Sequence, residues 1–178
     1  NDCVITDVAS VKQSTVDAVI EAFGELPSNL VPGHPIAGSE QSGFQAADPN
    51  LFVQRKVILT PEVQTNKAAL ALVNSLWCEL GAEVVEMSIQ QHDAILAATS
   101  HLPHLLAFAL VDSLSQQGSS DEIYKYAAGG FRDFTRIAAS DPEMWRDIFL
   151  SNAEALCSIL EEFESDLAEY QIQQKKIF

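Results

Sequence analysis

Residues 31–43 read VPGHPIAGSEQSG, and the organisation of the whole chain can be worked out from this stretch. One histidine, His34, stands between a glycine and a proline, and two further glycines follow it. Glycine permits backbone angles that other residues resist, and Pro35 fixes its own φ. The stretch therefore predicts a shaped loop that follows a short strand at residues 30–31. A titratable side chain on a stiff loop suits general acid–base catalysis. A histidine that only caps a helix or faces water is the alternative.

Strands and helices alternate on both sides of this loop as far as residue 87. Short runs rich in β-branched residues predict strands at residues 4–8, 56–60 and 82–87. Ser10 and Gln13 form a capping-box pattern, which predicts that a helix begins there and ends at Gly24. Its apolar face is expected to include Val11 and Phe23. This alternation is typical of a parallel α/β sheet.

The character of the sequence changes after Ser88, and every later element is predicted to be helical. Residues 88–117 predict one long helix that Pro103 kinks or loosens. A helix at residues 121–128 and a short turn at 129–136 follow, and Asp141-Pro142 predicts the start of the next helix. The last helix carries an apolar seam suited to pairing with another helix, formed by Leu156, Leu160, Phe163, Leu167 and Tyr170. The sequence thus predicts an α/β domain at residues 1–87 and a helical domain at 88–178.

Composition excludes some classes of partner. The 178 residues include 47% hydrophobic and 20% charged residues, as in a globular protein. A formal net charge of −15 argues against binding of nucleic acid, because phosphates would be repelled. The three cysteines are far apart and form no CxxC pattern, which suits a reducing compartment. Because the chain opens on Asn1 and runs straight into an apolar segment, we expect it to be a piece of a longer protein.

An apolar stretch at residues 94–111 has no Asp, Glu, Lys or Arg and is marginally long enough to span a membrane. Polar residues such as Ser100 and His101 lie at its centre, where lipid would make them costly. We therefore expect a helix buried in protein and no membrane partner.

The SHLPH segment at residues 100–104 places Ser100 and His104 on the same face of that helix. Two histidines three residues apart can bind zinc, but no nearby Glu or Cys completes a ligand set, so we expect no metal. The plain alternative is a core histidine bonded to a backbone carbonyl.

The GGFRDFTRIA segment at residues 129–138 carries Arg132, Asp133 and Arg136. A surface ion pair would explain them, and so would a guanidinium directed at a carboxylate ligand. Neither glycine-rich phosphate motif, GxGxxG or GxxxxGK[ST], occurs in the chain.

Taken together, these segments resemble the prephenate/arogenate (cyclohexadienyl) dehydrogenase family. The matching stretches are TDVASVK at residues 6–12, GHPIAGSEQSG at 33–43, KVILTP at 56–61, SHLPHLLAFAL at 100–110 and GGFRDFTRIAASDPEMWRDIFLSN at 129–152. Their order and spacing cover nearly the whole chain. The resemblance implies the C-terminal part of a Rossmann-like NAD(P)-binding domain followed by a helical dimerisation and substrate domain.

The resemblance also implies roles for individual residues. His34 matches the histidine that takes the proton of the ring hydroxyl, and Ser10 matches a serine near that hydroxyl and the nicotinamide. Arg136 matches the arginine that binds the substrate carboxylate. Further matches line the substrate pocket or its mouth: Ser100, His104, Ser39 and Glu40. Trp145 and Asp133 match positions that either support the pocket or touch the substrate.

The implied activity is oxidative decarboxylation of prephenate or arogenate with NAD or NADP, in tyrosine biosynthesis in the cytoplasm. A homodimer through the helical domain and fusion to another shikimate-pathway enzyme are also implied. The alternative is a non-catalytic dimerisation or regulatory module derived from such an enzyme. Dehydrogenases with a catalytic lysine on the inter-domain helix are disfavoured, because residues 88–117 contain no lysine.

Overall fold

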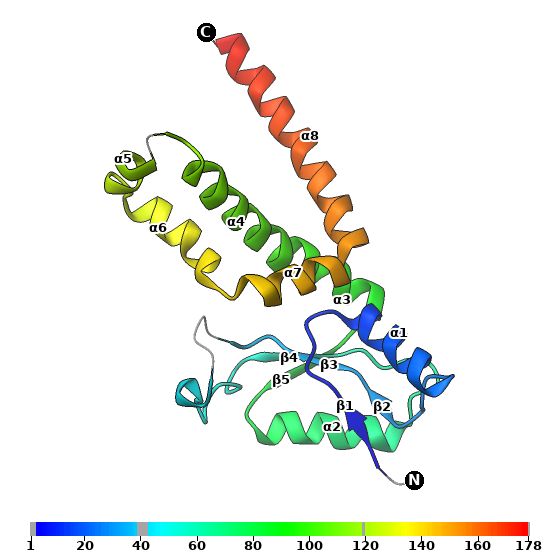
Figure 1. The fold of residues 1–178 in the computed structure, drawn as a ribbon. Coiled ribbons are helices and arrows are strands. Elements are labelled where there is room, and N and C mark those ends of the chain that lie inside the picture. Colours follow the sequence, from blue (N-terminus) through cyan, green and yellow to red (C-terminus); the bar gives the residue numbers. More distant parts are fainter. Residues whose placement is uncertain (1–2, 39–42, 119, 178) are drawn as a thin grey trace. The chain divides into compact units, whose positions relative to one another are not determined.

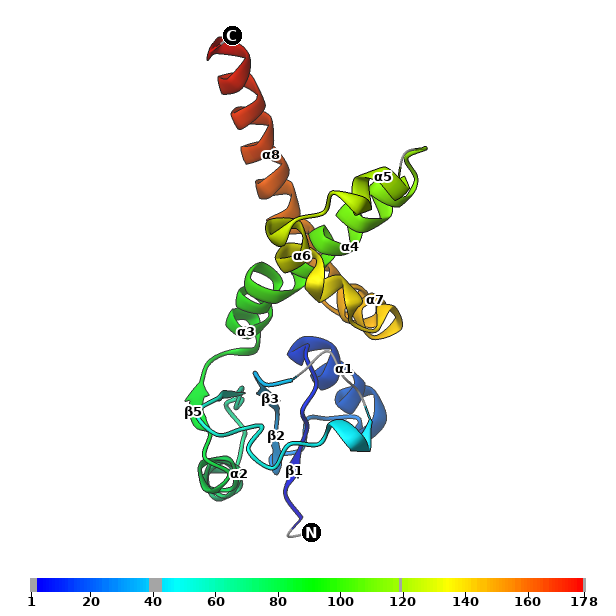
Figure 2. The same ribbon diagram turned by 90° about the vertical axis from the view of Figure 1, so that its left-hand side faces the viewer.

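The computed structural model describes residues 3–38, 43–118 and 120–177 (Figures 1 and 2). The chain divides into two compact units, Asn1–Asp93 and Ala94–Phe178. All the described strands belong to the first unit, and the second contains only helices among its described residues. The expected order, α/β followed by all-α, is confirmed.

The first unit contains two small sheets. In one, β1 (Ile5–Thr6) pairs in parallel with β2 (Leu30–Val31). In the other, β4 (Lys56–Leu59) lies between β3 (Gly33–Pro35) and β5 (Glu83–Glu86). The pairing of β4 with β5 is parallel, whereas β3 runs antiparallel to β4. The strands predicted from β-branched runs are therefore present, with a mixed sheet in place of a purely parallel one.

The segment that contains His34 is a strand, so the prediction of a loop at this position was wrong. His34 is paired with Ile58 of β4, and Pro35 with Val57. Because β3 is at the edge of its sheet, the missing N–H of Pro35 is tolerated. The strand pairing fixes the backbone on both sides of the histidine.

Helix α1 (Lys12–Phe23) ends as predicted at Gly24, whose φ of 80° is the left-handed conformation that favours glycine. The capping-box prediction was wrong, because the N-cap residue is Val11 and no side-chain cap comes from it. The predicted apolar face was also partly wrong. Lys12 is fully buried beside the buried Val11, whereas Phe23 is exposed.

The core of the first unit lies between the strands and α2 (Lys67–Glu79), which runs along them in Figure 1. The side chain of Asn66 caps α2 by accepting hydrogen bonds from the N–H groups of Ala68 and Ala69. The buried cluster consists of Val31, Val57, Leu59, Ala69, Val73 and Trp77. A short 3₁₀ turn, η1 (Phe44–Ala46), lies in the connection between β3 and β4.

The long predicted helix is present and is loosened just before Pro103. It consists of α3 (Ile89–Leu96), the π-helical turn η2 (Ala97–His101) and α4 (Leu102–Ser115). Proline has no N–H to offer the preceding turn, and a π-helical turn is one way to rearrange the backbone bonds there. The N–H of Leu102 accordingly bonds the carbonyl of Ala97, five residues earlier.

The remaining helices are α5 (Ser120–Lys125), α6 (Gly129–Thr135), η3 (Arg136–Ala139), α7 (Pro142–Ser151) and α8 (Ala153–Ile177). Asp141 caps α7 as predicted, because its carboxylate accepts from the N–H groups of Glu143 and Met144. The short turn predicted at residues 129–136 was wrong, since most of it is α6. Both α6 and η3 pack against α4, and such tertiary contacts stabilise a short helix despite its glycines.

The stretch Ile89–Ser115 is long and apolar enough to cross a membrane by length and composition, and 28% of its most apolar window is buried within the structure. Core helices pass the same test. The stretch carries buried polar side chains, namely His92, Asp93 and His101, each with hydrogen-bonding partners in the protein. Such residues would be costly in lipid.

Candidate functional site

His34 contacts a second histidine in the first unit. Its Nδ1 lies 2.9 Å from Nε2 of His92, and the two rings meet edge to face with centroids 5.1 Å apart. His34 is half-buried, whereas His92 is fully buried. On its other side, Nδ1 of His92 lies 2.7 Å from Oδ1 of Asp93. The strand that carries His34 is thereby joined to the start of α3.

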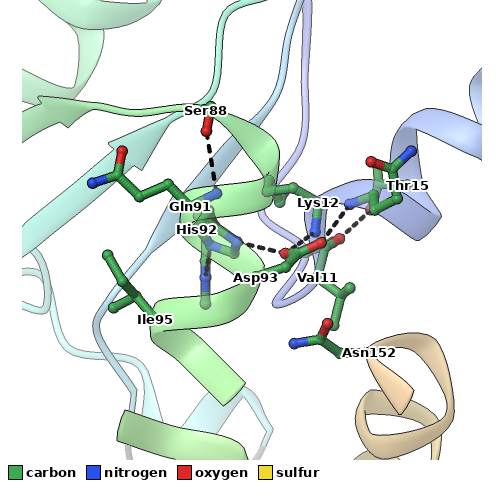
Figure 3. A network of polar contacts seen from close by, with 12 residues as sticks. Val11, Lys12, Thr15, Ser88, Gln91, His92, Asp93, Ile95 and Asn152 are labelled. Atoms are coloured by element: carbon green, nitrogen blue, oxygen red, sulfur yellow. Dashed lines mark hydrogen bonds and ion pairs between the residues drawn. The ribbon is translucent and has the colours of Figure 1, made fainter. Parts of the chain in front are cut away.

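The carboxylate of Asp93 also lies at the N-terminus of α1 (Figure 3). Its Oδ1 accepts from the backbone N–H of Lys12 at 2.9 Å, and its Oδ2 accepts from that of Gln13 at 2.9 Å. These N–H groups are among those that a helix leaves without an internal partner, and the helix dipole favours an anion beside them. Asp93 thus provides the cap that the sequence suggested for Ser10.

A second set of contacts holds the backbone next to His34. The buried ammonium group of Lys12 donates to Oδ1 of Asp7 and to the carbonyl oxygen of Gly33. The N–H of Gly33 in turn donates to Oδ2 of Asp7 at 3.2 Å. A Cβ added to Gly33 would lie 3.1 Å from the carbonyl oxygen of Asp7, so this close approach favours glycine. We call Asp7, Lys12 and Gly33 the strand clamp.

The charges of this region are shifted by their surroundings. Burial lowers the pKa of Lys12, and the charge of Asp7 with its hydrogen bond offsets only part of that effect. Burial alone would raise the pKa of Asp93. The hydrogen bonds from His92 and from the backbone of Lys12 and Gln13 outweigh it, so that the pKa of Asp93 is lowered. Asp93 is therefore an anion at neutral pH.

In the second unit, His104 is stacked on Trp145. Their ring centroids are 3.5 Å apart with planes inclined by 17°. Nδ1 of His104 donates to the backbone carbonyl of Ser100 at 2.9 Å. Burial lowers the pKa of His104, and this hydrogen bond opposes the shift only in part. The ring is therefore neutral at pH 7, with its proton on Nδ1 and Nε2 as an acceptor.

The indole of Trp145 carries a donor of its own beside this ring. Trp145 is only 7% exposed, and its Nε1 has no hydrogen-bonding partner among the described residues. A buried donor in this state is costly unless a bound group accepts from it. The Ser100, His104 and Trp145 group therefore suits a ligand that offers an acceptor.

The two histidines of the SHLPH segment have different partners. His101 is 1% exposed, and its Nδ1 lies 3.1 Å from Nδ2 of Asn152, whereas His104 contacts Trp145 and Ser100. Within residues 3–38, 43–118 and 120–177, no three His, Cys, Asp or Glu side chains gather in a way that could hold a metal ion.

The other predicted site residues lie elsewhere in the chain. Ser10 is half-buried in the bend before α1. Arg136 is exposed at the start of η3, and Asp133 is exposed on α6. Ser39 and Glu40 lie outside the described residues.

Sequence reasoning missed the functional candidates His92, Asp93, Lys12 and Asp7. Asp93 directly precedes the apolar stretch at residues 94–111 and was not singled out, and Lys12 appeared only as part of TDVASVK. The available signal was a His-Asp pair at the start of an apolar helix. Nothing in the sequence indicated that this pair meets α1, which lies 80 residues earlier.

Comparison with known proteins places these two units in one family. The family model described as the prephenate dehydrogenase nucleotide-binding domain matches residues 1–86. The one described as the prephenate dehydrogenase dimerization domain matches residues 88–175. The chain is thus of the class in which a nucleotide-binding domain precedes a helical dimerization domain. It belongs to the prephenate dehydrogenase family, as the resemblance in its motifs implied.

Individual relatives agree with this assignment. A cyclohexadienyl dehydrogenase of Zymomonas mobilis is 43% identical over 93% of this chain and 57% of its own length. A prephenate dehydrogenase of Bacillus subtilis is 42% identical over 92% of this chain and 44% of its own length. The solved prephenate dehydrogenase from A. aeolicus, in complex with hydroxyphenyl propionate and NAD+, superposes with a TM-score of 0.88 at 44% identity. That match covers 98% of this chain and 62% of the solved one. The chain thus spans about half the length of these curated relatives.

Replacing Lys12 by methionine should remove the strand clamp and leave the partly buried carboxylate of Asp7 without its cation. We expect the free energy of unfolding to fall by about 3 kcal/mol, as when one partner of a buried ion pair is lost. Lys56 and Glu83 form an exposed pair, so Lys56→Met is the control and should cost less than about 1 kcal/mol. Urea unfolding measures both, and equal losses would contradict the clamp.

The lowered pKa of His104 predicts a pH-dependent stability. The folded protein binds a proton at His104 less readily than the unfolded chain, whose ordinary pKa is 6.5. The stability from the neutral ring is therefore complete above that value and is lost as the pH falls below it. His104→Phe keeps an aromatic ring against Trp145 and should weaken this dependence. Urea midpoints at about pH 5 and about pH 7.5 test it, and identical pH dependence in both proteins would refute it.

Proposed function

We propose that the protein carrying this chain catalyses the oxidative decarboxylation of prephenate or arogenate, with NAD or NADP as the hydride acceptor. The observation that carries this proposal is the match of the chain, over residues 1–175, to the two successive domains of prephenate dehydrogenase. The products would be 4-hydroxyphenylpyruvate from prephenate or tyrosine from arogenate. Such a reaction belongs to tyrosine biosynthesis, and we expect it to take place in the cytoplasm.

In this proposal His34 is the general base. As hydride leaves ring carbon C4, His34 takes the proton of the hydroxyl group on that carbon. The carboxylate at C1 then departs as carbon dioxide, and the electron pair it leaves makes the ring aromatic with the charge on the C4 oxygen. That oxygen takes the proton back from His34 to give the phenol, and the gain of aromaticity makes this second step strongly downhill. The protein chiefly needs a base in the right place and a well-oriented substrate. The support for His34 in this role is its fixed position, with its backbone in β3 and its ring against His92.

The second unit is proposed to bind the carboxylates of the substrate. Arg136 would form a bidentate pair with one of them, which suits a dianion in a protein of net charge −15. His104, Ser100 and Trp145 would line the pocket, with the indole N–H of Trp145 as a donor. Ser39 and Glu40 are proposed at its mouth, on the basis of the GHPIAGSEQSG motif alone.

We propose that Ser10 contacts the nicotinamide side of the cofactor. A dinucleotide pyrophosphate commonly lies at a helix N-terminus behind a glycine-rich turn. The chain has no GxGxxG motif, and the first N–H groups of α1 are bonded to Asp93. The described residues therefore do not form a pyrophosphate site. When bound, the nicotinamide would supply the hydride acceptor, as expected for the nucleotide-binding family that residues 1–86 match.

We further propose that residues 1–87 and 88–178 are the two domains, and that the second makes a homodimer. The family model that matches residues 88–175 is described as a dimerization domain. Of the predicted seam on α8, Leu156 is buried, whereas Leu167 and Tyr170 are 45% and 63% exposed. This apolar surface suits a second copy of the chain. Fusion to another enzyme of the same pathway stays a prediction from the resemblance.

The effect of His34→Asn tests the function most simply. A general base contributes about a hundred- to ten-thousand-fold to turnover, so kcat should fall by that order while KM changes little. Formation of NADH or NADPH by the full-length protein, offered prephenate and then arogenate, measures this. An active wild type with an equally active, folded His34→Asn variant would remove the base assignment. An inactive wild type that is folded would instead favour the non-catalytic module.

The effect of Arg136→Ala should appear mainly in substrate binding. Loss of charge-assisted hydrogen bonds should raise KM about ten- to a hundredfold, with a smaller change in kcat. Arg136→Lys keeps the positive charge but not the planar guanidinium, so its KM should lie between those of the wild type and Arg136→Ala. Arg146 forms an exposed pair with Asp147, so Arg146→Ala is the matched control and should leave KM unchanged. A KM for Arg136→Ala equal to that control would exclude Arg136 from the substrate site.

A further inference from the structure

We propose that His92 and Asp93 are positioning residues that keep the basic nitrogen of His34 at Nε2 and strengthen it as a base. This inference rests on the proposed function for its catalytic consequence, but not for its structural one. The observation behind it is a continuous chain of polar contacts that runs from the N-terminus of α1 to the His34 ring. All the residues that make these polar contacts lie in the first unit.

The direction of each hydrogen bond follows from Asp93, the residue at which these contacts reach α1. The oxygens of Asp93 receive the N–H groups of Lys12 and Gln13, and an ionised carboxylate can only accept. Nδ1 of His92, 2.7 Å from Oδ1, must therefore carry a proton and donate it. A neutral His92 then has a bare Nε2, which accepts from Nδ1 of His34 at 2.9 Å. This leaves the lone pair of His34 at Nε2.

The same contacts favour the protonated form of His34. When Nε2 takes up a proton, Nδ1 continues to donate to His92, and the new positive charge lies one ring away from the Asp93 anion. A hydrogen bond from the charged form and a nearby opposite charge both favour the imidazolium. His92 is 0% exposed and Asp93 6% exposed, so water screens this effect little. Lys12 and Asp7 are charged groups in the same set of contacts and pair with each other, and the charge of Asp93 also acts on Lys12.

The cap at α1 gives this arrangement its rigidity. Asp93 cannot turn away from His92 without leaving the N–H groups of Lys12 and Gln13 unsatisfied. His92 lies in the first turn of α3, where the Ser88 hydroxyl accepts a hydrogen bond from the N–H of Gln91. The position of the His34 ring is thus fixed through the N-termini of both α1 and α3. Side chains that orient a functional histidine in this way commonly fix its tautomer as well.

Two substitutions at His92, made in the full-length protein, separate orientation from simple packing. In His92→Leu the side chain still fills space but cannot accept a hydrogen bond from His34. In His92→Gln the side-chain amide oxygen can accept that hydrogen bond. Long-range ¹H–¹⁵N NMR of the histidine rings reports both tautomer and pKa, with His34→Asn identifying the His34 signals. The wild type should show a His34 ring protonated at Nδ1. His92→Leu should lower its pKa by about one unit, and His92→Gln should restore most of the shift.

The kinetic consequence has a defined sign. Because a base acts when deprotonated, a lower His34 pKa moves the acidic limb of kcat/KM to lower pH in His92→Leu. The maximum should fall about tenfold, since a weaker base is poorer at taking a proton. Thermal unfolding of each variant verifies that it is folded.

Three results would overturn the inference. One is a wild-type His34 protonated at Nε2, a result that does not depend on any His92 variant. Another is an unchanged His34 pKa in His92→Leu, and the third is a His92→Gln variant that behaves like His92→Leu. The NMR result does not depend on turnover. A wild type inactive on both substrates would therefore reject the proposed function, while the NMR signals of the His34 ring would still test this inference.

Discussion

The carboxylate of Asp93 is the group on which the organisation of the first unit depends. It satisfies two backbone N–H groups of α1, and it accepts from His92. Each of these bonds involves a charged acceptor in a buried place, where such bonds contribute about 1.5–3 kcal/mol. A single side chain at the start of the long helical stretch therefore fixes how α1 and α3 meet. It also determines where His92 can present its second nitrogen.

Two sets of contacts consequently hold His34, and both involve the N-terminal residues of α1. Its ring contacts His92, which Asp93 orients from the first N–H groups of that helix. Its backbone is held through Gly33, which the side chain of Lys12 bonds from the same turn of the same helix. A histidine fixed in this way loses little further freedom when a substrate binds, and such preorganisation is what a catalytic base requires. The edge position of β3 leaves the histidine on a strand that is paired on one side only.

Local features of the fold could be predicted from the sequence. Asp141-Pro142 starts α7 because both residues act on their own turn, and Pro103 loosens the turn before it for the same reason. His34 could be singled out from the sequence as a candidate base, but its backbone conformation could not be predicted. Gly33 and Pro35 favour a loop locally, whereas pairing with β4, more than 20 residues later, makes the segment a strand.

The partners of His34 could not be predicted for a similar reason. Asp93 caps a helix 80 residues away, so no capping pattern is visible near it in the sequence. Lysine is rarely buried unless it is paired, and nothing near Lys12 in the sequence indicated that it pairs with Asp7. Of the proposed substrate residues, His104 bonds the backbone carbonyl of Ser100, four residues earlier. The unsatisfied indole of Trp145 beside them became visible only in the structure.

The stoichiometry of the reaction tests the central claim most directly. The full-length protein would be incubated with prephenate and an excess of NAD+ or NADP+, and the carbon dioxide, reduced nicotinamide and aromatic product would be quantified together. The account predicts equimolar amounts of all three, because hydride loss and decarboxylation occur on the same molecule; an inactive prephenate reaction would be repeated with arogenate. Reduced nicotinamide without carbon dioxide, or no reaction of a folded protein with either substrate, would contradict it.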